Sequence, residues 1–591
     1  MNTKVMDTTN GSKYQRFFSL DFARGLAIFV MLFLHIIQRT LNMEELFANI
    51  NNVALINLFA LVLIPFFGGL AGFFLIISAA ANMVSIYRDL EKGKSIKSLV
   101  FKQVIGGLLL LIFAMLCEGL IGYQGLMGNF AKSLDNIANT EWTVMLWRWN
   151  FFETIHTIAW CLIINGCIQG LLSLKGNWKN TKRMIISYII LAVIVVGLTQ
   201  PIWYLIGLLV PGYPFGLYPS GHELFMPWIG TESFWQIFRA PFLNPLSAPM
   251  EPIFPYLAIS FIGSVLGIIL SQPKDKISKK FPRNFGLVGL AMFIGGLVGI
   301  IIVIVKILVA TDFDTAIDFY LVFINHRAWA ADYASYVPPF AWIGQFLAVN
   351  GFSIMLIMFL FRLVEFRGKA QVYAERTKIV RRFGIVAFTN YNNQWMYFVV
   401  FFLTSLMLTK DAYQPLFWGG VFLTIVLTYL LYSLILFGWE KINYIGSLEW
   451  FIRTFTNNVI PARRKKFDSS VKWWQRGQVD VEKTFYNVDW INLGNAELDN
   501  KVFNEKSDEE KKLVNLEDSK FALSISLIGL CSILFIVLNI LSLFVAIKTR
   551  KTEGKNKYNI AALIISIIGI VLFVALIIVT LILPIGILGI F

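Results

Sequence analysis

Apolar runs of about 20 residues recur along the whole chain, and this is the length that an α-helix needs to cross about 30 Å of hydrocarbon. They lie at 17–40, 58–84, 99–123, 151–173, 184–209, 253–271, 285–310, 340–364, 383–409, 415–438, 521–547 and 559–590. Only 15% of the residues are charged, against about 25% in a soluble domain. The pattern predicts an all-α polytopic integral membrane protein with about ten core helices and a two-helix C-terminal membrane tail.

The polar segments divide the chain into four parts. We expect a cytoplasmic N-terminus at 1–15, a transmembrane core at 16–456, a polar cytoplasmic linker at 457–519 and a two-helix membrane domain at 520–591. The linker carries a basic run, 463–466, and then Trp473 and Trp474. This mixture is typical of a surface on anionic headgroups or of an ordinary solvated linker.

The net charge of +15 follows the topology. Alternate loops, 85–99, 174–183, 274–283 and 362–382, hold 4, 4, 5 and 7 Lys/Arg, whereas the loops between them hold only about six altogether. The positive-inside rule therefore predicts a multi-pass protein of the cell membrane with its N-terminus in the cytoplasm, and gives no reason to expect nucleic acid as a partner. The basic loop 548–557 contradicts this count, because ten preceding spans place it outside.

One outward loop, 210–252, is rich in proline and contains Trp228 and Trp235. Disordered segments are poor in aromatic residues, so the loop is typical either of a lid or binding wall or of aromatic anchoring at the membrane interface.

The first apolar run contains three ionisable residues, Asp21, Arg24 and His35. At 100° per residue they share one helix face with Ile28 and Met31, and Arg24 and His35 lie about 16 Å apart along the axis. Asp21 and Arg24, three positions apart, are expected to pair. Such residues in a membrane span usually face the protein interior or a wet cavity.

Further polar residues fall near the ends of other spans. Glu118, Glu153 and His156 lie toward the outer side, and Asn390, Asn393 and Gln394 form an amide cluster near the inner side. A histidine beside a carboxylate is the usual general base, but each of these groups also suits a contact between helices. His222, Glu223 and His326 have no diagnostic metal-binding spacing, so we expect no metal site.

Five stretches resemble a known superfamily. They are "LDFARGLAIFVMLFLH" (20–35), "GFFLIISAAAN" (72–82), "PIFPYLAISFIGSVLG" (252–267), "FGIVAFTNYNNQW" (383–395) and "IGSLEWFIRTFT" (445–456). The first resembles membrane acyltransferases that O-acylate cell-surface glycans, and the second is similar to a motif of the same superfamily. The third resembles its heparan-glucosaminide N-acetyltransferase-like members, and the last two resemble its YeiB-like members. The chain departs from that pattern at His35, where relatives often have asparagine, at Ser447 in place of proline, and at Ala79 and Ala80, where glycine is common.

The resemblance implies a membrane acyltransferase that takes an acyl group from cytoplasmic acetyl-CoA or another acyl-CoA. The acceptor would be an extracytoplasmic glycan or membrane lipid headgroup. Arg24 and Arg381 would then bind the phosphates of the donor, which need cations. Asp21, Asn390, Asn393 and Gln394 would complete the donor site. His35 would activate the acceptor, with Glu153 or Glu118 orienting it and His156 nearby.

Two other functions fit the same sequence. One is a transporter or lipid-translocating protein without chemistry, and the other is a scaffold whose Trp473 region and tail recruit partners. A homodimer is also compatible with the chain.

Overall fold

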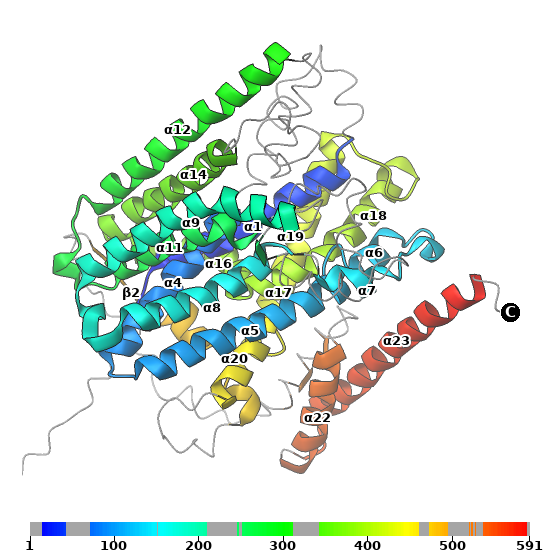
Figure 1. Ribbon diagram of the computed structural model, residues 1–591. Helices are drawn as coiled ribbons and strands as arrows, with labels where there is room; N and C mark the ends of the chain where they lie inside the picture. Colours follow the sequence, from blue (N-terminus) through cyan, green and yellow to red (C-terminus); the bar gives the residue numbers. More distant parts are fainter. Residues whose placement is uncertain are drawn as a thin grey trace, which may run out of the picture.

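The structure, a computed structural model, describes residues 15–42, 71–150, 152–209, 245–246, 251–310, 342–459, 472–493, 519, 522–523, 526–527, 536–552 and 554–587. Within these ranges nine helices are long and apolar enough to cross a membrane. They are α1 (Phe18–Thr40), α4 (Ala71–Glu91), α5 (Ile96–Leu120), α8 (Thr154–Leu172), α9 (Thr181–Leu209), α11 (Ile253–Leu270), α12 (Phe281–Ala310), α14 (Trp342–Leu363) and α19 (Trp418–Glu440). The chain is therefore an all-α polytopic membrane protein, as the apolar runs predict (Figure 1).

Short elements connect or extend these helices. They are α6 (Leu126–Lys132), η2 (Ile137–Asn139), α7 (Val144–Trp147), η3 (Arg148–Asn150), η4 (Leu174–Lys179), η5 (Lys274–Lys276), η7 (Glu365–Arg367), α15 (Ala370–Arg376), α20 (Leu448–Val459), η9 (Trp473–Gln475) and η10 (Glu482–Tyr486). The described residues contain two short strands, β1 (Gln15–Arg16) and β2 (Asp489–Trp490).

Helices α4, α11 and α14 form the interior, while α5, α9 and α12 expose most of their apolar side chains. α11 packs closely on α4 through glycines: a Cβ at Gly263 would lie 2.6 Å from the Ile76 carbonyl oxygen, and one at Gly267 would lie 2.6 Å from the Ala80 carbonyl oxygen. Small residues are the usual means of bringing membrane helices together, because no water is released between them.

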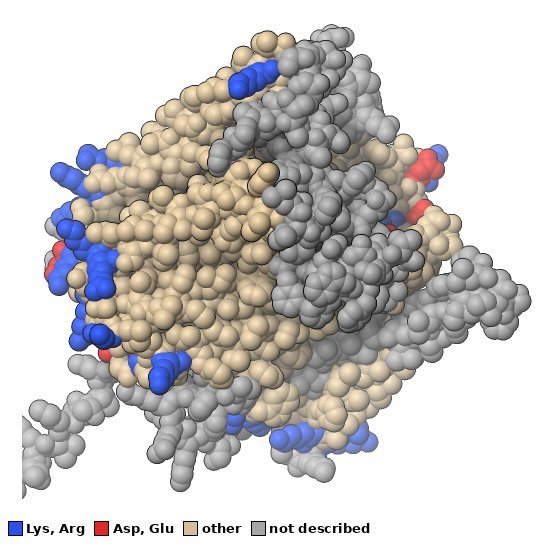
Figure 2. Space-filling view, viewed as in Figure 1, with Lys and Arg blue, Asp and Glu red and all other residues tan. Residues whose placement is uncertain are grey.

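Lysine and arginine gather at one end of the bundle, which we call the basic end (Figure 2). Here α4, α8, α11 and α14 finish and α5, α9 and α12 begin, with the cations of 88–102, 175–183, 274–283 and 362–382. The opposite end, called the far end, carries segments 121–150 and 410–417. This asymmetry is the one that the positive-inside rule uses.

The predicted span 383–409 is wrong as a single helix. The chain forms α16 (Lys378–Ile385), α17 (Ala387–Asn392), η8 (Asn393–Trp395) and α18 (Met396–Thr409) instead. The break falls at Val386, where φ is −119° and ψ is 50°. Non-helical backbone at membrane depth is tolerated only where protein or a water-filled cavity surrounds it.

Glu449 of α20 satisfies the backbone groups freed at this break. Its Oε1 accepts from Phe388 N at 2.7 Å and from Thr389 N at 3.4 Å, and its Oε2 accepts from Thr389 Oγ1 at 2.6 Å. A carboxylate here does the work of an N-cap, because the first amides of a helix have no partner inside it.

Part of the predicted linker packs onto the core at the basic end. β2 pairs in parallel with β1, and Leu493 N donates to the Glu365 carbonyl oxygen at 2.8 Å. Val479 N also donates to the Asn443 carbonyl oxygen at 3.0 Å. Residues 472–493 are therefore docked rather than a free solvated linker, while the basic run 463–466 lies outside the described residues.

The tail differs from the predicted span 521–547. α22 (Ile536–Thr552) packs against α23 (Lys557–Ile587), and Ser542 Oγ donates to the Ala522 carbonyl oxygen at 2.7 Å. Twenty positions of one helix would separate these residues by about 30 Å, so they do not belong to one continuous helix. Lys548 Nζ lies 5.4 Å from the Trp474 ring centroid. The basic loop that contradicted the span count therefore lies beside the docked segment of the basic end.

We expect Gly25→Ala to lower the free energy of unfolding by about 1–3 kcal/mol, because overpacking forces the backbone to shift. A Cβ at Gly25 of α1 would lie 2.0 Å from the Val380 carbonyl oxygen of α16. Thermal unfolding of the purified protein in detergent measures the loss. Gly106→Ala in α5 is the control, since nothing lies within 4 Å of its Cβ position. An equal loss in both variants would contradict the packing argument.

Candidate functional site

The polar face of α1 lies inside the bundle. Asp21, Arg24, Met31 and His35 are each half-buried, whereas Ile28 on the same face is 2% exposed. Ser19 N donates to Glu365 Oε1 at 2.7 Å, which fixes the start of α1 beside the end of α14 at the basic end. Arg24 therefore lies toward the basic end and His35 toward the far end.

Asp21 does not pair with Arg24 as its spacing predicts. Arg16 forms an ion pair with Asp21 instead. Its Nη2 donates to Oδ1 at 2.9 Å, and its Nε lies 2.8 Å from Oδ2. The hydrogen bond from Nη2 is charge-assisted, and such bonds are roughly twice as strong as neutral ones. Among the described residues Arg24 has no hydrogen bond or ion pair, so its guanidinium is available to a ligand.

Arg381, predicted to bind the donor phosphates, is used in packing. It is 1% exposed, and its Nη2 donates to the Thr484 carbonyl oxygen at 2.5 Å while Nη1 donates to that of Ala374 at 3.3 Å. Its guanidinium also lies 4.6 Å from the Trp490 ring centroid. Burial lowers the pKa of Arg381 to about 10, so it stays charged at neutral pH. The docked segment 472–493 covers Arg381 through Thr484 and Trp490, and its role as a donor ligand stays a prediction.

His35 contacts Gln394 of η8 rather than Glu118 or Glu153. Its Nδ1 is hydrogen-bonded to Gln394 Oε1, and its ring stacks on that of Tyr123 with centroids 5.0 Å apart. Gln394 Nε2 donates to the Tyr391 carbonyl oxygen at 2.8 Å. Because the amide nitrogen must face that carbonyl, its oxygen faces the imidazole. Gln394 thus holds His35 from the break in the predicted ninth span.

The side chain of Asn390 bonds to the backbone, whereas Asn393 takes part through its own backbone carbonyl. Asn390 Nδ2 donates to the Phe383 carbonyl oxygen at 3.1 Å, across the break at Val386. The Asn393 carbonyl oxygen accepts from Tyr432 Oη at 2.6 Å. The sequence left open whether these amides bind a ligand or join helices, and the Asn390 side chain joins α17 to α16.

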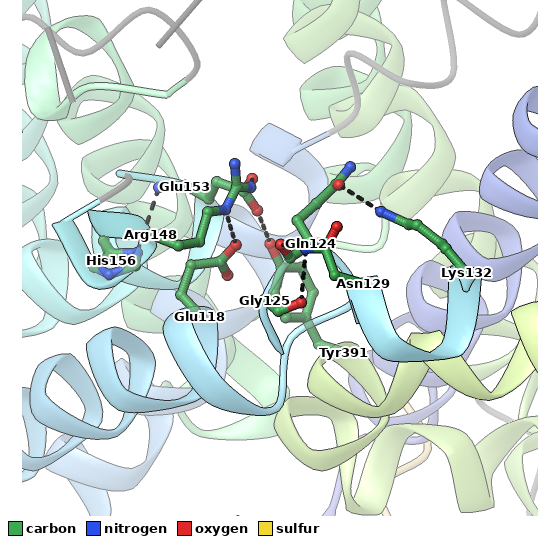
Figure 3. A network of polar contacts seen from close by, with 9 residues as sticks. All are labelled: Glu118, Gln124, Gly125, Asn129, Lys132, Arg148, Glu153, His156 and Tyr391. Atoms are coloured by element: carbon green, nitrogen blue, oxygen red, sulfur yellow. Dashed lines mark hydrogen bonds and ion pairs between the residues drawn. The ribbon is translucent and has the colours of Figure 1, made fainter. Parts of the chain in front are cut away.

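A buried ion-pair network joins Glu118, Arg148 and Glu153 (Figure 3). Arg148 of η3, 6% exposed, donates from Nε to Glu118 Oε1 at 3.0 Å and from Nη2 to Glu153 Oε1 at 2.6 Å. Tyr391 Oη donates to Glu153 Oε2 at 2.6 Å. Tyr391 thus contacts Gln394 through its backbone carbonyl and Glu153 through its side chain, which places it between the His35 contact and the ion-pair network.

Glu153 and His156 meet at the start of α8. Glu153 N donates to His156 Nδ1 at 3.3 Å, and the Glu153 side chain accepts from the His156 backbone in return. This reciprocal arrangement is a capping box, which satisfies two orphan amides of the helix start. The spacing thus correctly predicts the contact, and the contact serves to begin the helix.

Sequence reasoning missed Arg148, Tyr391 and Tyr123. A signal was present for Arg148, because it is one of the few cations in the outward loops and two buried carboxylates need a counter-charge. His222, Glu223 and His326, with most of the loop 210–252, lie outside the described residues.

Comparison of the chain with protein-family models, with curated proteins and with solved structures finds no match.

Proposed function

We propose that this protein is a membrane acyltransferase that moves an acyl group from acyl-CoA, acetyl-CoA above all, to a glycan or lipid headgroup on the other side of the cell membrane. In this proposal the basic end faces the cytoplasm and the far end faces outward. The single observation that carries the proposal is α1 itself. It presents a guanidinium, Arg24, that forms no ion pair with any described residue, and an oriented imidazole, His35, on one face inside the bundle.

Arg24 supports binding of the donor. A cation inside a helix bundle is costly without an anionic partner, and the described residues offer it none within hydrogen-bonding distance. The phosphates of an acyl-CoA would supply that partner. The donor would then extend along α1 toward His35, about 16 Å farther along the axis.

His35 supports the chemical step. The acceptor hydroxyl or amine attacks the thioester carbonyl carbon while His35 Nε2 takes its proton. The carbon–sulfur bond then breaks, and the proton passes to the leaving sulfur. The products are the acylated acceptor and free CoA, so atoms and charge balance without a metal or a redox partner.

We expect Arg24→Gln to raise the KM for acetyl-CoA about tenfold to hundredfold, because a hydrogen bond to a charged group contributes about 1.5–3 kcal/mol. Release of free CoA from labelled acetyl-CoA by the reconstituted protein, with a cell-envelope extract as acceptor, measures this. Arg362→Gln is the control, since Arg362 is exposed at the same end. Solute movement across the vesicle membrane without any CoA release would favour a transporter instead.

A further inference from the structure

Two cations of the far end lie near His35. Arg39 follows His35 by one turn of α1 and is exposed, and Lys132 is the last residue of α6. In the part of the chain that the structure describes, neither has a carboxylate within 4.0 Å. The loops of this end hold few cations, so two beside the candidate base require an explanation.

Neutral groups hold Lys132 in place. Its Nζ donates to Gln124 Oε1 at 2.9 Å and lies 4.9 Å from the Phe398 ring centroid (Figure 3). The turn of chain around it is fixed as well, because Tyr413 Oη donates to the Ala131 carbonyl oxygen at 2.5 Å. An ammonium group has three N–H donors, so two remain for a ligand.

The same loop touches both Lys132 and His35. Gln124 binds the Lys132 ammonium, and Tyr123, the preceding residue, stacks on the His35 ring at 5.0 Å. Lys132 and His35 are therefore held by neighbouring residues of one loop.

Positive charge outweighs negative charge around Lys132, where the effect of Glu141 is smaller than those of Arg39 and Arg148. Burial, and then the charges of Arg39 and Arg148, lower the pKa of Lys132 to about 7. Arg148 already binds both buried carboxylates, Glu118 and Glu153. Like charges that share a partly buried region repel each other, and a bound anion would remove that repulsion.

We propose that Arg39 and Lys132 bind a phosphate or phosphodiester group of the acceptor and hold it beside His35. The term acceptor rests on the proposed function, whereas the binding of the anion does not. Arginine suits a phosphate because its N–H groups match two oxygens at once, and lysine adds a point charge. The phosphate has two sources, the headgroup of an outer-leaflet lipid or a soluble phosphate-bearing glycan.

Amine labelling followed by mass spectrometry tests this site without any acyl donor, so its result is independent of the CoA assay. The full chain is placed in nanodiscs of phosphatidylcholine, and Lys132 is labelled with or without an anionic probe. One arm replaces part of the lipid with phosphatidylglycerol, and the other adds glycerol phosphate to the solution. Lys410, exposed near the far end of α18, is the internal control.

We expect labelling of Lys132 to fall about tenfold when a probe is present at about ten times its Kd, with no change at Lys410. Arg39→Gln should remove most of this protection, and its exposed position makes misfolding a minor concern. Protection by phosphatidylglycerol alone identifies a lipid headgroup, and protection by glycerol phosphate alone identifies a soluble acceptor. Equal labelling of Lys132 with and without both probes overturns the proposal.

Discussion

Arg148→Met is expected to lower the free energy of unfolding by about 3–5 kcal/mol, the usual loss when one partner of a buried ion pair is removed. Arg148 holds Glu118 and Glu153 at 3.0 and 2.6 Å, and the two carboxylates are 3% and 8% exposed. Without the guanidinium, two like charges share a site with little water. Tyr391 supplies one hydrogen bond to Glu153 and no positive charge.

Thermal unfolding in detergent measures the loss, with two controls that separate charge from volume. Arg183→Met removes an exposed arginine and should change stability by less than about 0.5 kcal/mol. The triple variant Arg148→Met, Glu118→Gln, Glu153→Gln keeps the shapes but removes the charges, so it should regain most of the lost stability. A triple variant as unstable as the single one would show that lost packing, and not unpaired charge, is the cause.

The sequence predicts the membrane helices well, because a segment in hydrocarbon must satisfy its backbone hydrogen bonds within itself. An apolar run of sufficient length is therefore close to a sufficient signal, as α5 and α12 illustrate. The break inside 383–409 does not carry such a signal. It depends on Glu449, which is 60 positions away from Thr389 and accepts from its amide nitrogen.

The site is predicted where its members share one helix, and it is missed where they do not. The periodicity of α1 correctly places Arg24 and His35 on one face, because helix geometry fixes that relation. The partners come from other segments. Asp21 is bonded to Arg16 and not to Arg24. Arg381 donates to the Thr484 carbonyl, and His35 is bonded to Gln394. Residue type limits such pairings, but only packing between distant segments decides among them.

The hydrogen bond from Gln394 determines which nitrogen of His35 is available for chemistry. Gln394 Nε2 donates to the Tyr391 carbonyl at 2.8 Å, so its oxygen accepts the proton of His35 Nδ1. The neutral imidazole then carries its lone pair on Nε2. An imidazole held in one tautomer with a free lone pair is the arrangement that a general base requires.

We therefore expect His35→Ala to lower the kcat of acyl transfer by about 10²–10⁴-fold, the usual contribution of a general base. KM for acetyl-CoA should change little, because the proposed donor contact is Arg24. Gln394→Leu should give a smaller loss of kcat, since it frees the ring to adopt the other tautomer without removing it. Gln38→Ala, an exposed neighbour on α1, is the matched control.

CoA release at saturating acetyl-CoA measures kcat, and thermal unfolding checks that each variant is folded. The comparison between the variants tests the mechanism more sharply than either variant alone. If kcat falls in His35→Ala but is unchanged in Gln394→Leu, the reaction does not require Gln394 to fix the tautomer of the His35 ring. Full activity of a folded His35→Ala variant would remove the base from the mechanism, and Arg24 would then remain as a cation inside the bundle with no reaction assigned to it.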